Sequence, residues 1–190
     1  MNTFRLINKI EKSIINNDLL QISSEILSYL KKKDYRFYIF INDERGESKF
    51  PLIYLVSCEN SNILEEGLKY ENIHTAGIYF GFIKKGIFYL SLEGAEFLHN
   101  QQVLPNSNKI TINEEGEKSI LYGNDVLKSV ITKIPSKLKK NNLLAVFNQN
   151  KEIIAIARAT IDSSSFQNLK LNQKVAQNLV DKGYYLRKRQ

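Results

Sequence analysis

The sequence predicts an α+β protein in which a domain of helices and strands is followed by a basic part built from short strands. Two observations carry this prediction. Short runs of β-branched and aromatic residues alternate with turn signals, and helical spacing is confined to a few stretches. Residues 1–112 hold 13 Lys and Arg against 13 Asp and Glu, whereas residues 113–190 hold 14 against 7. The whole net charge of +7 therefore lies in the second part, and clustered cations are typical of a surface that meets phosphate.

Length and composition indicate a globular chain with one large or two small domains. The chain has 190 residues, of which 43% are apolar and 25% charged. Its longest apolar runs, such as 52–56 and 143–147, are far shorter than the roughly 18 residues of a membrane-spanning helix. The first residues lack the apolar core of a secretory signal, and the single Cys58 fits a reducing compartment. We expect a cytoplasmic protein, or a nuclear or nucleolar one if the source is eukaryotic.

The first part of the chain predicts three helices. Apolar residues recur at helical spacing over 4–14, and the polar residues 16–18 should end that helix. A second helix is expected over 24–32, where three lysines follow the apolar face and suit the negative end of the helix dipole. A third is expected over 60–69, with two capping candidates, Ser61 and Asn62.

The same part predicts a sheet that ends in a hairpin. The expected strands are residues 35–41, 51–57, 77–83 and 87–92. The last two are joined by Lys84-Lys85-Gly86, where glycine can take the positive φ of a tight turn. A turn or loop is expected at 42–49 and a helical turn at 93–99.

We place a domain boundary at about residue 104, giving an N-terminal domain of residues 1–104 and a C-terminal domain of residues 105–190. The second domain should begin with a loop at 105–108, a strand at 109–112 and a turn at 113–116. Two strands joined by an asparagine-containing turn follow, and 163–165 form a loop or a helix start. The later strands expected are 143–147, 153–160, 175–180 and 184–186.

The stretch 119–131 stands before this basic part. Gly123 supplies a turn, and Asn124 or Asp125 can cap a helix through a side-chain oxygen. The apolar residues after the cap would give that short helix a buried face; they are Val126, Leu127, Val130 and Ile131.

Chemistry typical of enzymes is missing from the sequence. His74 and His99 are not spaced as a ligand pair with Cys58, and no phosphate-binding or nucleophile motif occurs. The neighbouring carboxylates at 65–66 and 114–115 point in different directions if helical, so they make poor acid and base partners. We expect no catalytic residues, no metal and no cofactor.

The segment Ile120-Leu-Tyr-Gly-Asn-Asp-Val-Leu-Lys-Ser129 resembles the Phe-Leu-Tyr-Gly-Asn-His-Val-Leu-Lys-Ser signature of the Nip-seven family of large-subunit ribosome biogenesis factors. The similarity continues to Val180-Asp-Lys-Gly-Tyr-Tyr-Leu-Arg187, near the family's Ala-Asp-Ile-Gly-Glu-Tyr-Val-Arg ending, and covers residues 77–190. The chain is thus similar to an archaeal-type member. It departs from the signature at Asp125, where the family has His, and at Val130, where it has Gly.

The resemblance implies an N-terminal α/β domain, with an antiparallel sheet and helices, followed by a PUA domain, an RNA-binding β pseudo-barrel with short helices. It also implies a non-enzymatic role in pre-rRNA processing and large-subunit assembly, with RNA and other assembly proteins as partners. Carried over by position and weighed for phosphate contact or base stacking, the RNA-binding candidates are Lys128, Arg158, Lys170, Lys174, Lys182, Arg187, Tyr122 and Tyr184.

Two other interpretations remain open. PUA domains also accompany RNA-modification enzymes, so the chain is alternatively such an enzyme or its accessory RNA-binding subunit. The N-terminal domain, with no net charge and many aromatic residues, is expected to dock partner proteins rather than RNA.

Overall fold

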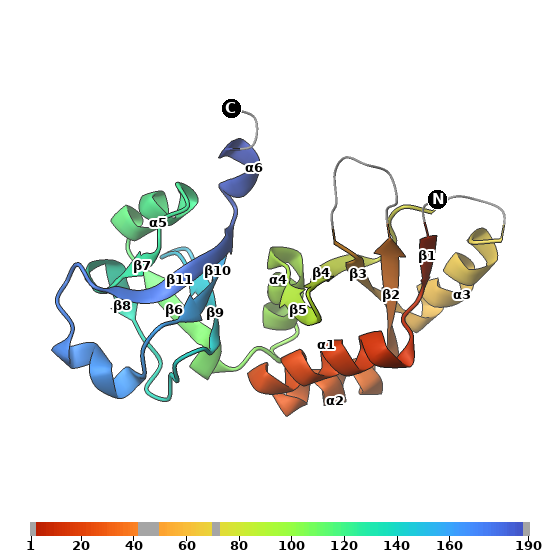
Figure 1. Ribbon diagram of the computed structural model, residues 1–190, viewed down its shortest axis with the longest axis horizontal. Helices are drawn as coiled ribbons and strands as arrows, with labels where there is room; N and C mark the ends of the chain where they lie inside the picture. Colours follow the sequence, from red (N-terminus) through yellow and green to blue (C-terminus); the bar gives the residue numbers. More distant parts are fainter. Residues whose placement is uncertain (1–2, 42–49, 70–72, 188–190) are drawn as a thin grey trace. The chain divides into compact units, whose positions relative to one another are not determined.

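The computed structural model describes residues 3–41, 50–69 and 73–187, and the chain divides into two compact units, Met1–Val103 and Leu104–Gln190 (Figure 1). Each unit holds one sheet. The architecture confirms the predicted α+β class, with an antiparallel sheet and helices first and a nearly closed β pseudo-barrel second. The loop expected at 42–49 lies outside the described residues.

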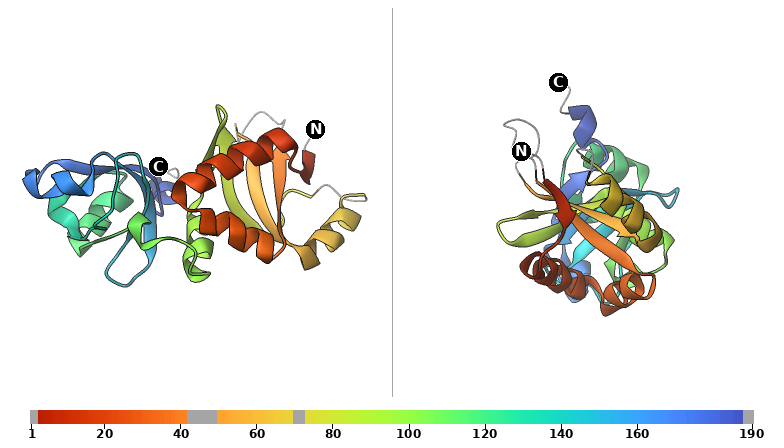
Figure 2. Two further views of the ribbon diagram at one scale, coloured as in Figure 1. Left: turned by 90° about the horizontal axis from the view of Figure 1, so that it is seen from below. Right: turned by 90° about the vertical axis from the view of Figure 1, so that its right-hand side faces the viewer.

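The described residues of the N-terminal unit form a five-stranded sheet in which each strand is antiparallel to the next one along the chain (Figures 1 and 2). The strands are β1 (Thr3–Leu6), β2 (Tyr35–Ile41), β3 (Leu52–Ser57), β4 (Ile78–Lys84) and β5 (Ile87–Leu90). The turn between β4 and β5 confirms the predicted hairpin, because Lys85 and Gly86 take φ values of +51° and +74° there.

Helices cover both faces of this sheet. One face carries Phe37 and Phe80, whose ring centroids lie 5.6 Å apart, and it is covered by α1 (Lys9–Ile22), α2 (Ser24–Lys32) and α4 (Leu92–Asn100). The other face is covered by α3 (Cys58–Gly67), whose Leu64 packs into an aromatic cluster with Phe4, Tyr38, Phe40 and Tyr54. The strand alternation of period two sends neighbouring residues of β2 to these two layers.

The start of the chain is a strand where the sequence predicted a helix. Phe4 pairs with Phe40 and is buried, whereas Ile10, expected on the buried helix face, is 73% exposed. The helix begins later because Asn8 caps it: the Asn8 side chain accepts from the Glu11 amide at 2.9 Å, and the Glu11 carboxylate accepts from the Asn8 amide at 2.7 Å.

The same helix continues through residues 16–18, which were predicted to end it. Ile15 and Leu19 are fully buried and hold this part of α1 against the sheet. The Asp18 carboxylate accepts a hydrogen bond from the Phe88 amide of β5 at 2.7 Å, so a residue that disfavours helices in isolation gains a tertiary partner.

The helix α3 begins two residues earlier than predicted and is not capped by Ser61. Ser61 is fully buried, and its hydroxyl lies 2.8 Å from that of Tyr38, which also donates to the Glu65 carboxylate at 3.1 Å. Burial raises the pKa of the Tyr38 hydroxyl.

The C-terminal unit is built on a sheet in the order β7-β11-β10-β9-β6-β8. β6 and β9 are parallel, and the other neighbours are antiparallel. The strands are β6 (Lys109–Ile112), β7 (Val126–Leu127), β8 (Ile131–Lys133), β9 (Leu143–Phe147), β10 (Ile153–Ala159) and β11 (Lys174–Asp181). The helical segments are η1 (Asn106–Asn108), α5 (Glu114–Leu121), η2 (Lys128–Val130), η3 (Ser163–Asn168) and α6 (Tyr184–Arg187).

The connection through η2 nearly closes this sheet into a barrel. β7 and β8 stand at the two ends of the strand order, yet only the three residues of η2 separate them in sequence. The sheet must therefore curl until its edges approach each other. The interior is filled by buried aliphatic side chains, among them Ile110, Ile112, Ile120, Leu144, Val146 and Ile154.

Two predictions for this unit outside the motif at 119–131 are wrong. The residues 113–116, expected as a turn, start α5, because the Asn113 side chain accepts from the Gly116 amide at 2.8 Å and caps the helix. The residues 184–186, expected as a strand, lie in α6. None of the helices in the described ranges has the length and hydrophobicity needed to cross a membrane.

Candidate nucleic-acid interface

The motif at 120–129 forms a helix end, a glycine turn and an edge strand. The Gly123 amide donates to the Ile120 carbonyl at 2.8 Å, and its φ of +91° favours glycine. The chain is then extended, and Val126 pairs with Ala176 of β11. The predicted order is therefore wrong: the helix precedes Gly123, because the apolar residues after it complete the edge of the sheet rather than a helix face.

The Asp125 carboxylate, predicted as a possible helix cap, instead faces β11. It accepts a hydrogen bond from the Asn178 backbone amide at 2.9 Å and lies 3.1 Å from the Lys174 ammonium. The side chains of this ion pair are 45% exposed for Lys174 and 36% for Asp125, so the pair contributes at most about 1 kcal/mol. Lys174 can therefore exchange Asp125 for a phosphate oxygen at little cost.

The motif lysine, Lys128, makes contacts inside the protein. Its ammonium donates to the backbone carbonyls of Gln167 at 2.9 Å and Leu169 at 2.7 Å, and it lies 5.3 Å from the centre of the Phe166 ring. These contacts fasten η3 and the residue after it to the start of η2. We therefore expect Lys128 to shape the surface that the neighbouring lysines present.

The segment 180–187 also has internal partners. Arg187 holds the buried Asp181 carboxylate with two hydrogen bonds of 2.9 Å, and it also donates to the Leu121 carbonyl at the end of α5. The hydrogen bond with Asp181 raises the pKa of the Arg187 guanidinium. Gly183 permits this approach, because a Cβ there would lie 2.0 Å from the Leu121 carbonyl oxygen.

Three predicted cations lie at one end of the central strands. Arg158 near the end of β10 is half-buried and donates to the Asn141 carbonyl at 3.4 Å. Lys174 starts β11, and the exposed Lys170 lies in the turn before it. The register places these strand ends together, because Ala159 pairs with Ala176.

The other predicted residues lie at the opposite end of β11. Lys182 follows the last residue of that strand and is exposed. Tyr122, directly after α5, is 78% exposed, and Tyr184, at the start of α6, is 42% exposed. Eight residues of strand place Lys174 and Lys182 about 25 Å apart, so the predicted residues form two groups rather than one.

A turn of lysines that the site prediction missed adjoins the first group. Lys137, Lys139 and Lys140 are exposed, whereas Leu138 between them is 2% exposed and anchors the turn in the core. The turn is further fixed by hydrogen bonds: the Lys140 amide donates to the Asp162 carboxylate at 2.9 Å, and the Ser163 amide donates to the Leu138 carbonyl at 2.9 Å. The density of lysines over 133–140 was the available sequence signal.

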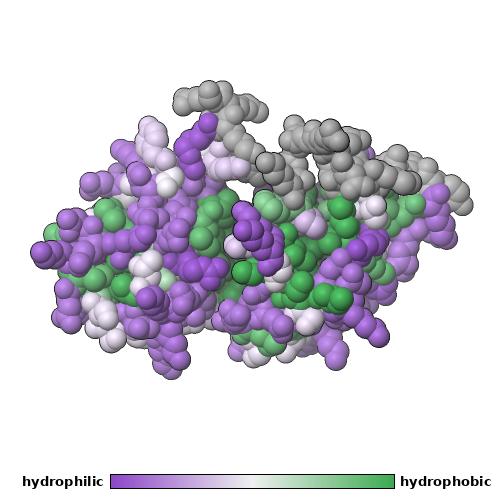
Figure 3. All heavy atoms as spheres, in the orientation of Figure 1, coloured by the Kyte–Doolittle hydropathy of each residue, from purple (hydrophilic) through white to green (hydrophobic). Residues whose placement is uncertain are grey.

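We call the surface formed by these two sets the basic end. It consists of Lys137, Lys139, Lys140, Arg158, Lys170 and Lys174. In Figure 3, hydrophilic side chains cover most of the visible face of the C-terminal unit, at the left. Asp162 lies beside the basic end but already accepts the Lys140 amide, so one nearby carboxylate serves the backbone rather than a lysine ammonium. Such a surface attracts phosphates electrostatically.

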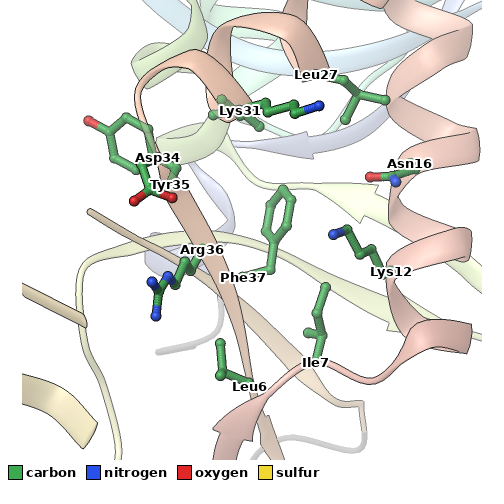
Figure 4. Close-up of a pocket in the computed structure, with 11 residues that line it drawn as sticks. Leu6, Ile7, Lys12, Asn16, Leu27, Lys31, Asp34, Tyr35, Arg36 and Phe37 are labelled. Atoms are coloured by element: carbon green, nitrogen blue, oxygen red, sulfur yellow. The ribbon is translucent and has the colours of Figure 1, made fainter. Parts of the chain in front are cut away.

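The N-terminal unit contains a hollow of about 540 Å³ between α1, α2 and the start of β2. Aliphatic and aromatic side chains line much of it, and Figure 4 shows Lys12 reaching from α1 toward Phe37 and Lys31 lying near Leu27. Asp34 lies on the other side of this view; its hydrogen bond with the Cys58 thiol raises the pKa of that thiol.

Metal-ligating side chains do not gather in the part of the chain that the structure describes. Within residues 3–41, 50–69 and 73–187, no three His, Cys, Asp or Glu residues form a group that could hold a metal ion. His74 packs instead against Phe40, with ring centroids 5.6 Å apart.

Solved structures with the same fold span the chain. A conserved PUA domain protein from Thermoplasma acidophilum has a TM-score of 0.62 and 17% identity, and 97% of each chain is covered. A hypothetical protein from Pyrococcus horikoshii has a TM-score of 0.63 and 13% identity, with 94% of each chain covered. At these identities, the likeness shows the fold alone.

Comparisons of sequence show the family as well as the fold. A family model described as the UPF0113 PUA domain matches residues 108–190, and PUA is an RNA-binding fold. The UPF0113 protein of Archaeoglobus fulgidus is 31% identical over 173 residues, which cover 90% of this chain and 92% of the relative. Because this similarity extends through both units, the chain as a whole belongs to the UPF0113 family, with a PUA domain as its C-terminal part.

Proposed function

We propose that this protein is a non-catalytic RNA-binding factor in large-subunit ribosome assembly and pre-rRNA processing. In this proposal the PUA domain binds single-stranded regions of pre-rRNA or rRNA, and the N-terminal unit binds other assembly proteins. The observation that carries the RNA-binding part is the basic end, where six cations from three neighbouring segments adjoin one end of the barrel.

The chemistry of the basic end suits the phosphate backbone. Lys139, Lys140 and Lys170 are exposed, and the fixed turn around Leu138 presents the first two without a large ordering cost. Contacts of this kind give affinity that falls steeply with salt and depends little on base sequence.

Exposed tyrosines at the opposite end of β11 suit unpaired bases. Tyr122 is 78% exposed at the turn that follows α5, so its ring can stack on a base. Stacking of this kind contributes about 1 to 3 kcal/mol per base. An RNA that follows β11 would then meet phosphate contacts at one end and a stacking contact at the other.

Charge reversal at the basic end tests this assignment. The variant Lys139→Glu/Lys140→Glu/Lys170→Glu should bind single-stranded RNA much more weakly than the unmodified chain in a filter or mobility assay. If all three lysines contact phosphates, the slope of log affinity against log salt should also become shallower by about 2, from roughly 0.7 per phosphate.

A matched control reverses the same number of charges on the N-terminal unit. Lys69, Lys84 and Lys85 are exposed there, and Lys69→Glu/Lys84→Glu/Lys85→Glu has the same net charge as the test variant. Equal weakening by both variants would mean that net charge alone governs binding, and would refute the site. Circular dichroism checks that both variants fold.

The cellular role rests on the motif at 120–129, which resembles the Nip-seven signature. Crosslinking in cells followed by sequencing of the attached RNA tests it. Large-subunit rRNA among the crosslinked species is the expected result. Recovery of tRNA in its place would favour an RNA-modification enzyme or its accessory subunit.

A further inference from the structure

We propose that the hollow between α1 and α2 binds a segment of a partner protein that carries apolar side chains next to carboxylates. This inference deepens the partner-binding part of the proposed function and does not depend on RNA binding. It rests on three features of the hollow: its apolar lining, two lysines at its walls, and the engagement of the nearby acids.

The lining offers an apolar surface to a ligand. Leu6 is 43% exposed, and Ile7, Leu27 and Tyr35 are half-buried around it. A volume of about 540 Å³ lies within the range of pockets that hold ligands, roughly 300 to 1,000 Å³. Exposed apolar area of this kind gains free energy when another apolar side chain covers it.

Two lysines from different helices give the hollow a positive wall. Lys12 belongs to α1 and Lys31 to the last turn of α2, and both are exposed. Within the described ranges, no carboxylate forms an ion pair with either of them. In Figure 4 they lie on the side of the hollow away from Asp34.

The acids around the hollow already have partners. Glu11 pairs with Arg5 at 2.8 Å, and Glu65 lies 3.4 Å from Arg36. Asp34 lies at the far edge, where it interacts with the Cys58 thiol, and within the described residues it forms no ion pair with either lysine. The two lysines therefore lack internal counter-charges, and carboxylates on a ligand would supply them.

The character of the lining favours a peptide over RNA. Leu6, Ile7, Leu27 and Leu30 are aliphatic and offer no flat ring on which a base can stack. The two rings of the lining are already engaged: Tyr35 packs against Phe97 with centroids 5.3 Å apart, and Phe37, which is 9% exposed, packs against Phe80. A ligand segment with Leu or Phe next to Asp or Glu matches both the apolar lining and the two lysines.

Selection from a displayed library of short random peptides on the full chain tests the proposal. We expect the enriched peptides to combine acidic and large apolar residues. A synthetic copy of the most enriched peptide, labelled for fluorescence anisotropy, should bind Lys12→Glu/Lys31→Glu at least about tenfold more weakly than the unmodified chain.

The control is Lys9→Glu/Lys32→Glu, which makes the same charge change on the same two helices at exposed residues outside the lining. It should change peptide affinity by much less. A second test variant, Leu27→Ser, alters the floor without changing charge and should also weaken the peptide.

Three outcomes would overturn the inference: enrichment of peptides without acidic residues, equal binding by the two lysine variants, or no enrichment above the display background. RNA affinity measured on the same variants should stay constant. A loss of RNA binding in Lys12→Glu/Lys31→Glu would show that this surface contacts nucleic acid instead. Failure of the basic-end variants to affect RNA would count against the RNA proposal alone.

Discussion

Replacing Lys128 by Met separates a structural role of the motif lysine from a role in RNA binding. Met keeps the length and the apolar stem of the side chain but removes the ammonium. The two hydrogen bonds to the carbonyls of Gln167 and Leu169 and the contact with the Phe166 ring are lost together.

The expected loss of stability follows from the exposure of these contacts. A hydrogen bond to a charged group contributes about 1.5 to 3 kcal/mol when it is buried. Here the Gln167 bond is exposed and the Leu169 bond is partly buried, so we count about 1 kcal/mol for the two bonds together, roughly half of one such buried bond. The ring contact adds about 0.5 kcal/mol at an exposed site. Lys128→Met should therefore lower the free energy of unfolding by about 1.5 kcal/mol.

Urea denaturation followed by far-ultraviolet circular dichroism measures this change, since the chain has no Trp to serve as a fluorescent probe. RNA affinity is measured over a range of salt under conditions where the variant is folded. Lys170→Met is the matched control, because Lys170 is exposed. We expect it to retain stability but to make the salt slope shallower by about 0.7, the value for one phosphate on a single strand.

The opposite pattern would refute the reasoning. A Lys128→Met variant of unchanged stability, whose salt slope becomes shallower by about 0.7, would mean that the ammonium binds phosphate and that its internal bonds contribute nothing.

Three further predictions concern stability. The hydrogen bonds from Arg5 lower the pKa of Glu11 in the folded protein. The contribution of Glu11 to folding stability is therefore complete above its unfolded-state pKa and disappears as pH falls through its folded-state pKa. Glu11→Gln should make the free energy of unfolding depend less on pH in an acid titration. Gly183→Ala should prevent folding or make the C-terminal unit unfold at a much lower temperature, because the new Cβ would lie 2.0 Å from a carbonyl oxygen of α5. The control Gly86→Ala has open space around the Cβ and a φ of +74°, so in a thermal melt it should lower stability by only about 1 kcal/mol. Tyr38→Phe should cost about 1 kcal/mol at neutral pH, and, because the folded pKa of Tyr38 is raised, should reduce the stability lost as pH rises through that pKa in an alkaline titration.

The sequence predicted the elements whose signals are local. The β4–β5 hairpin has its turn residues in place, β9 is a continuous apolar run, and β10 is apolar except for Arg158. The predicted first helix failed because Phe4 and the apolar residues of α1 fit one helical period by coincidence, while the cap at Asn8 divides them. A capping box is itself a sequence signal, so this error was avoidable.

The prediction of a helix after Gly123 failed for a different reason. Val126 and Leu127 suit a helix face or a short edge strand equally well, and only pairing with β11, some fifty residues away in sequence, decides between them. The pairing of the strands also decides which of the predicted RNA-binding residues lie close together. Nothing local indicates that Lys140 bonds to Asp162 or that Arg187 binds the carbonyl of Leu121.

The closure of the barrel through η2 sets where the chain tolerates changes in length. The three residues Lys128–Val130 join the first and last strands of the sheet order, so an inserted or deleted residue there would alter the stagger of the whole barrel. The exposed turn at 149–151 joins two adjacent strands and carries no such constraint. Among related sequences, insertions should therefore accumulate in the turn and be absent from η2. This distribution of insertions would test the closure of the barrel without any binding measurement.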